Sequence, residues 1–304
     1  MANKFDDLVD QDDSLNHGNG TNIDKPTTPE DVERETYTEE ELRDVNAISV
    51  TIPDQNTPIV VFFGSQASGK TLALMRMIRF WEANQHTVIA EEVFRPKTDK
   101  HYSRMCQELK SMVYSEYTPG GTDVISFMLV KVLNPVGQPI CQILEAPGEH
   151  YFDGTSNIDF PRYINAISTT PNRKVWVFFV EQGWGQTQSD RNLYAQKICS
   201  MQGLISPNDK VVFLFNKADK QRKNGQYDRT GKPRKQLFFD QIKREYPGIF
   251  TRYQNSGLTK FLYGEYNFKV VCFSAGKFNR TNDGKEVWTP EIDWYCSEFW
   301  DAIK

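Results

Sequence analysis

The chain has 304 residues, 38% of them apolar, and a formal net charge of −4, which is enough material for one large domain or two small ones. Its five cysteines are odd in number and lack C-x-x-C spacing, so neither a disulfide framework nor a zinc site is indicated. We find no cationic start followed by an apolar core and no apolar run of about 20 residues. A cytoplasmic protein without direct membrane insertion is therefore expected.

Residues 1–45 differ in composition from the rest. They carry 14 acidic and four basic residues, a net charge of −10, which leaves +6 for residues 46–304. With Phe5 and Tyr37 as its aromatic residues, this segment cannot bury enough surface to offset its conformational entropy. We expect a disordered acidic tail, either a solvated spacer or a docking arm for a basic partner, ahead of one domain over residues 46–304.

A phosphate-binding loop opens this domain. The apolar run 58–63 predicts a strand, and residues 71–82 predict a helix with one apolar face. The G-x-x-x-x-G-K-[ST] motif between them can fold its backbone N–H groups around phosphate oxygens at a helix N-terminus. Lys70 would meet the terminal phosphate, and the Thr71 hydroxyl would ligate Mg²⁺. The residues expected to line the phosphates are Gln66, Ala67, Ser68, Gly69, Lys70, Thr71 and Leu72.

Strand and helix patterns alternate along the domain. Two β-rich runs on either side of a Pro/Gly turn predict an antiparallel hairpin, and unbroken apolar runs predict strands buried on both faces of a parallel sheet. The expected strands are 47–52, 58–63, 88–90, 124–133, 139–145, 175–180, 210–215 and 268–273. The expected helices are 71–82, 100–114, 190–201, 236–246 and 291–303. The fold class is therefore α/β: a doubly wound P-loop domain with a mostly parallel sheet and one antiparallel hairpin strand.

Three further polar motifs follow predicted strands, where ligands bind in an open α/β sheet. Glu145 ends the strand expected at 139–145 and could hold magnesium through water. The Gly148 backbone N–H, three residues later, could meet the terminal phosphate. The second motif ends in Asp219, whose carboxylate can accept both N1–H and N2–H of guanine, a donor pair that adenine lacks. The second and third motifs consist of Asn216, Lys217, Asp219, Ser274, Ala275 and Gly276.

Taken in order, these motifs resemble those of the TRAFAC-class P-loop GTPases, the group that contains the Ras-like and translation-factor GTPases. The resemblance covers about 230 residues from Ile59 onward, and the general layout is similar to bacterial members of the group. It implies GTP/GDP and Mg²⁺ as cofactors, slow GTP hydrolysis, and a nucleotide-dependent switch that acts on a protein effector or activating partner. By resemblance, Asn216 braces the base-binding loops, the Lys217 stem covers the base, and the Ala275 N–H faces guanine O6.

The sequence departs from this group at two acidic positions. Glu145 stands where members usually carry aspartate, so its longer side chain changes how magnesium is held. Glu149 stands where many carry a water-orienting glutamine, and its charge would repel a triphosphate. The switch threonine is assigned to Thr122, with Thr118 as the second choice. The expected catalytic residues are thus Lys70, Thr122, Gly148 and Glu149, and the expected metal ligands are Thr71, Thr122 and Glu145.

Other functions stay open at this point. The two glutamates favour a pseudo-GTPase scaffold that binds guanine nucleotide without turnover. A membrane-remodelling GTPase lacks support because no long heptad helices are present, and an ATPase would contradict the role given to Asp219. The basic segment 217–236 is interpreted as a solvated loop rather than a site for nucleic acid or the acidic tail. Arg95 is a candidate arginine finger, although a structural salt bridge is the simpler interpretation.

Overall fold

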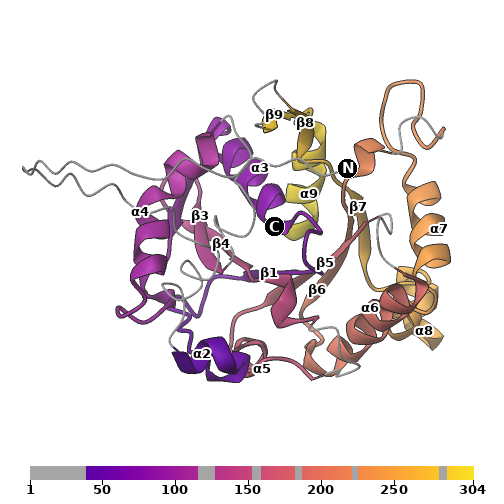
Figure 1. Ribbon diagram of the computed structural model, residues 1–304. Helices are drawn as coiled ribbons and strands as arrows, with labels where there is room; N and C mark the ends of the chain where they lie inside the picture. Colours follow the sequence, from indigo (N-terminus) through magenta and orange to yellow (C-terminus); the bar gives the residue numbers. More distant parts are fainter. Residues whose placement is uncertain (1–38, 116–126, 153–158, 182–186, 221–224, 281–285) are drawn as a thin grey trace, which may run out of the picture.

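The computed structural model describes residues 39–115, 127–152, 159–181, 187–220, 225–280 and 286–304 (Figure 1). Its main sheet has seven strands in the order β2-β3-β4-β1-β5-β6-β7. β1 pairs in parallel with β4 and β5, and β5, β6 and β7 continue the parallel arrangement, whereas β3 is antiparallel to both β2 and β4. The strands are β1 (Ile59–Phe63), β2 (Thr87–Ala90), β3 (Met128–Leu133), β4 (Pro139–Glu145), β5 (Lys174–Val180), β6 (Lys210–Phe215) and β7 (Lys269–Cys272). The α/β class with its antiparallel hairpin is confirmed.

Helices cover both faces of this sheet (Figure 1). α3, α4 and α9 contact one another or the sheet on one side, and α5 and α6 lie on the other. Every residue of β1 and β5 is buried, as expected for strands covered on both faces. The helices are α2 (Glu39–Arg43), α3 (Lys70–Ala83), α4 (Lys100–Tyr114), α5 (Arg162–Thr169), α6 (Gln188–Ser200), α7 (Lys235–Glu245), α8 (Gly257–Tyr263) and α9 (Trp294–Ile303). None of the helices in the described ranges is long and apolar enough to cross a membrane.

The strand expected at 47–52 is wrong. Ala47 ends a short 3-10 helix, η1 (Val45–Ala47), and residues 48–52 belong to no strand. Ile48 and Ile52 are buried in the core, which accounts for the alternating pattern. The Thr51 N–H donates to the Phe94 carbonyl at 2.8 Å, so this segment bonds to a 3-10 helix, η2 (Glu92–Phe94), and not to the sheet.

The end of the expected acidic tail packs against the domain. Glu41, in α2, accepts hydrogen bonds from the Arg95 guanidinium at 3.0 and 2.8 Å, and Asp99 accepts another at 2.9 Å. Arg95 is 3% exposed, so this is a buried ion-pair network. It supports the structural interpretation of Arg95 over a role as an arginine finger.

A second, two-stranded sheet was not predicted. It consists of β8 (Gly276–Arg280) and β9 (Glu286–Pro290), which pair antiparallel immediately after the Ser274-Ala275 motif. The residues expected to begin the C-terminal helix near Glu291 instead precede α9, which begins at Trp294.

Candidate nucleotide site

The phosphate loop connects β1 to α3 and closes on itself. Gly69 caps α3 with φ of +85°, a left-handed conformation that glycine adopts readily. The Lys70 side chain turns back over the loop, where its Nζ donates to the carbonyl oxygens of Gly64 at 3.0 Å and Ser65 at 3.1 Å. Burial lowers the pKa of Lys70, while the charges of nearby glutamates oppose that shift. The loop thus surrounds the Lys70 ammonium group, which a phosphate could draw away from the two carbonyl oxygens.

Thr71 and Glu145, which were predicted to hold magnesium, lie in contact. Thr71 Oγ1 donates to Glu145 Oε1 at 3.1 Å, which joins the start of α3 to the end of β4. Glu145 is 2% exposed, and burial raises its pKa, against the opposing effects of the Lys70 charge and the Thr71 hydroxyl. Its second oxygen, Oε2, is buried and has no hydrogen-bond partner in the part of the chain that the structure describes.

This donor set fits a magnesium ion. A hydroxyl and a carboxylate are the oxygen ligands that Mg²⁺ accepts, and the orphaned Oε2 provides an acceptor for the ion or one of its waters. Thr71 and Glu145 would hold it. Thr122 and Thr118, the proposed switch threonines, lie outside the described residues.

Gly148 lies directly against the phosphate loop. It begins the 3-10 helix η4 (Gly148–His150), and a Cβ built on it would stand 2.2 Å from Gln66 N and 2.4 Å from Ser65 C. Glu149 is exposed beside this contact. His150 is partly buried, with its Nδ1 3.1 Å from the Tyr163 hydroxyl.

The motif that contains Asn216 and Lys217 is tied to the phosphate loop. Asn216 Nδ2 donates to the Ser68 carbonyl at 2.7 Å, and Lys217 Nζ donates to the Ala67 carbonyl at 2.9 Å. Lys217 also forms an ion pair with Glu181, which directly follows β5. Glu181 was not singled out from the sequence, although its place at a strand end was a usable signal.

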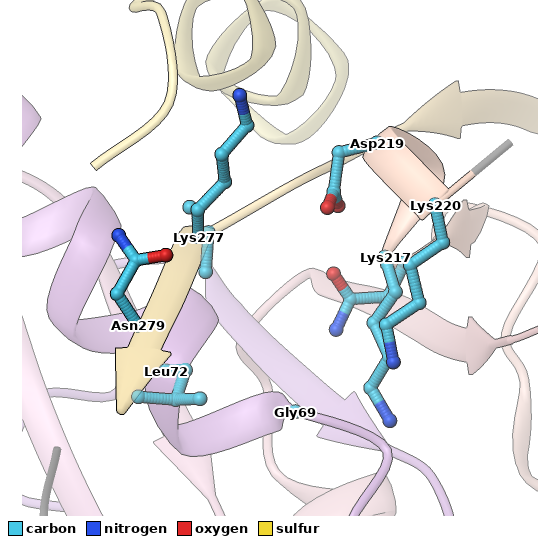
Figure 2. Close-up of a pocket in the computed structure, with 10 residues that line it drawn as sticks. Gly69, Leu72, Lys217, Asp219, Lys220, Lys277 and Asn279 are labelled. Atoms are coloured by element: carbon cyan, nitrogen blue, oxygen red, sulfur yellow. The ribbon is translucent and has the colours of Figure 1, made fainter. Parts of the chain in front are cut away.

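Asp219 is oriented by the third motif. Ser274 Oγ donates to Asp219 Oδ1 at 2.6 Å, so the ends of β6 and β7 meet at this carboxylate. Figure 2 shows Asp219 beside a pocket of about 490 Å³, with Lys217 and Lys220 on one side. The pocket is lined by Gly69, Leu72, Asn216, Lys217, Asp219, Lys220, Ala275, Gly276, Lys277 and Asn279. Of these, Lys220, Lys277 and Asn279 were missed, because they belong to no recognised motif.

No protein-family model and no curated protein sequence matches the chain. Among solved structures it is similar to nucleolar GTP-binding protein 1 from Plasmodium falciparum, at 14% identity and a TM-score of 0.37, covering 75% of this chain and 81% of that one. It is similar to the S. cerevisiae Ski7 GTPase-like domain, bound to GTP, at 14% identity and a TM-score of 0.35, covering 72% of this chain. There it spans only 43% of the Ski7 chain.

A third similar structure is the signal recognition particle receptor SRb-GTP/SRX complex from Chaetomium thermophilum. Identity is 11% and the TM-score 0.39, with 81% of this chain and 96% of that one covered. By their descriptions, all three are GTP-binding or GTPase-like proteins. The chain itself has a mostly parallel seven-stranded sheet and a G-x-x-x-x-G-K-[ST] loop between β1 and α3.

Proposed function

We propose that the chain binds GTP and GDP with Mg²⁺, hydrolyses GTP slowly, and acts as a nucleotide-dependent switch for a protein partner. One observation carries the guanine assignment: the Asp219 carboxylate is held by Ser274 at 2.6 Å beside a pocket that also reaches Gly69 of the phosphate loop. An ionised carboxylate there can accept the N1–H and N2–H of guanine together. Adenine lacks this donor pair, so the carboxylate would keep only its hydrogen bond from Ser274.

The phosphate end of the site would supply positive charge and would hold the phosphates in position. The Lys70 ammonium would exchange its two loop carbonyls for phosphate oxygens. Magnesium, when bound, would neutralise phosphate charge, and the contact between Thr71 and Glu145 supports these two residues as its ligands. Gly148 packs on the loop at Gln66, which supports a role for its N–H as a donor to the terminal phosphate. Positioning of this kind without a further cation gives turnover as slow as ~10⁻⁴ per second.

A protein partner belongs to the same proposal. Arg95 is engaged by Glu41 and Asp99 in a buried network, so it is not free to stabilise the transition state. An activating protein that inserts an arginine would raise turnover by roughly 10³ to 10⁵. A cytoplasmic location, with soluble protein partners, suits this role.

A pseudo-GTPase is the second candidate, and two observations favour it. Burial raises the pKa of Glu145, and a neutral carboxyl would hold magnesium less well than a carboxylate. Glu149 is exposed next to Gly148, where its charge would repel a triphosphate rather than position water.

Two measurements test these functions. Nucleotide released from the purified protein by denaturation and identified by chromatography and mass spectrometry should be GDP or GTP; an adenine nucleotide would overturn the guanine assignment. Single-turnover hydrolysis of GTP with saturating Mg²⁺ should then release phosphate faster than the Lys70→Ala variant does. Tight GTP binding with no release above buffer, with or without an arginine-donating activator, would establish the pseudo-GTPase instead.

A further inference from the structure

The β8–β9 hairpin contributes to the pocket but has no part in the function proposed so far. It begins at Gly276, the last residue of the motif that orients Asp219. Lys277 and Asn279, alternate residues of β8, both line the pocket. Figure 2 shows β8 across the pocket from Lys217, so the pocket has a wall on each side.

This hairpin is fixed to the base-binding loop. The buried Trp288 of β9 donates its indole N–H to the Ala275 carbonyl at 3.2 Å. Gly276 has φ of +145°, and a Cβ on it would stand 2.3 Å from the Thr289 carbonyl oxygen, so the strands approach too closely for any side chain there. The guanidinium of Arg79 in α3 lies 4.1 Å from the centre of the Trp288 ring. These contacts fix the hairpin against the Ala275 loop and α3.

The two ends of the pocket are assigned to the phosphates and the base of the nucleotide. The sugar is the remaining part, and the hairpin is the remaining wall. Gly69 and Leu72, in and after the phosphate loop, mark the phosphate end, and Asp219 marks the edge of the base. The ribose of a nucleotide lies between these two ends. Asn279 is exposed to the pocket, and within the described ranges its amide makes no hydrogen bond.

An amide suits a ribose because it presents both a donor and an acceptor. The two neighbouring hydroxyls of the sugar each donate and accept, so one asparagine can satisfy both. Lys277, on the same face of β8, carries an aliphatic stem long enough to cover the base opposite Lys217.

We propose that the β8–β9 hairpin is the second wall of the nucleoside pocket and that Asn279 recognises the ribose hydroxyls. This inference rests on the proposed binding of guanine nucleotide. It makes Asn279 a residue that distinguishes ribonucleotides from deoxy and dideoxy forms, a selection that neither the phosphate loop nor Asp219 provides.

Titration calorimetry with GDP and with 2′,3′-dideoxy-GDP, both with Mg²⁺, tests this. The wild type should bind GDP roughly 3- to 10-fold more tightly, the value of one or two net hydrogen bonds. Asn279→Ala should lower GDP affinity to that of the dideoxy compound and leave dideoxy-GDP binding unchanged. Thr289→Ala is the matched control, because Thr289 is exposed on the same hairpin and does not line the pocket; it should keep the wild-type ratio.

The outcomes separate the two proposals. A wild type that binds neither compound refutes the guanine-nucleotide function and this inference with it. A wild type that binds both compounds equally, or an Asn279→Ala variant that retains the wild-type ratio, refutes the inference alone. Thermal unfolding of the free variants confirms that they are folded. If Asn279→Ala loses affinity for GDP and for dideoxy-GDP in equal measure, the effect is merely structural and the ribose assignment is overturned.

Discussion

Replacing Gly148 with alanine is expected to destabilise the protein by a purely steric effect. The new Cβ would stand 2.2 Å from Gln66 N and 2.4 Å from Ser65 C, whereas ordinary contact begins near 3.4 Å. The two segments would have to separate by about 1 Å. Because both opposing atoms are backbone, no change of rotamer relieves the overlap. Overpacking of this kind costs about 1–3 kcal/mol of unfolding free energy.

Urea denaturation of the nucleotide-free protein, followed by tryptophan fluorescence, measures this loss. Gly203→Ala is the matched control: Gly203 lies in the 3-10 helix η5 (Met201–Leu204), and a Cβ there would meet nothing within 4 Å. Its free energy of unfolding should stay within about 0.5 kcal/mol of the wild type. A Gly148→Ala variant as stable as the Gly203→Ala variant would show that residue 148 does not pack on the phosphate loop.

Two further predictions concern the groups around η4 and α2. Arg95→Met leaves the carboxylates of Glu41 and Asp99 buried without their cation, so urea denaturation should show a loss of about 3–5 kcal/mol; a loss below about 1 kcal/mol would contradict the buried network. Burial lowers the pKa of His150 from 6.5 to about 4, so the unfolded chain takes up a proton at higher pH than the native state does. Stability that is present above pH 6.5 should therefore be lost as the pH falls toward 4, by at most about 3 kcal/mol, and His150→Gln should remove that part of the pH dependence. An unchanged slope of unfolding free energy against pH in the variant would exclude His150 as its source.

The main sheet could be predicted because burial on both faces leaves a clear pattern. β1, β5 and β6 read as unbroken apolar runs, and the polar residues that follow each strand mark its end at the ligand rim. The contacts of Thr71 with Glu145 and of Ser274 with Asp219 bring together residues whose proximity motif order had predicted. The strands could be predicted from local sequence, and the proximity of these residues from the rule that ligands bind at the carboxyl ends of strands in an open α/β sheet.

The missed parts depend on long-range packing. The segment at 47–52 buries Ile48 and Ile52 and bonds through Thr51 to Phe94, a partner distant in the sequence that no local pattern identifies. Asn279 lines the pocket because Trp288 holds the hairpin on Ala275, a contact between residues with no shared motif. α8 has no buried residue and thus no apolar periodicity to reveal it.

The most direct test of the guanine assignment is the nucleotide preference of Asp219→Asn. Calorimetry should show that the wild type binds GDP roughly 100-fold or more tightly than ADP or xanthosine diphosphate, since two hydrogen bonds to an ionised carboxylate are at stake. Asparagine replaces one acceptor with an amide donor that suits the xanthine carbonyl, so the variant should prefer xanthosine diphosphate to GDP. A wild type that binds ADP as tightly as GDP, or a variant that still prefers GDP, would contradict the assignment of Asp219 as the guanine-reading residue.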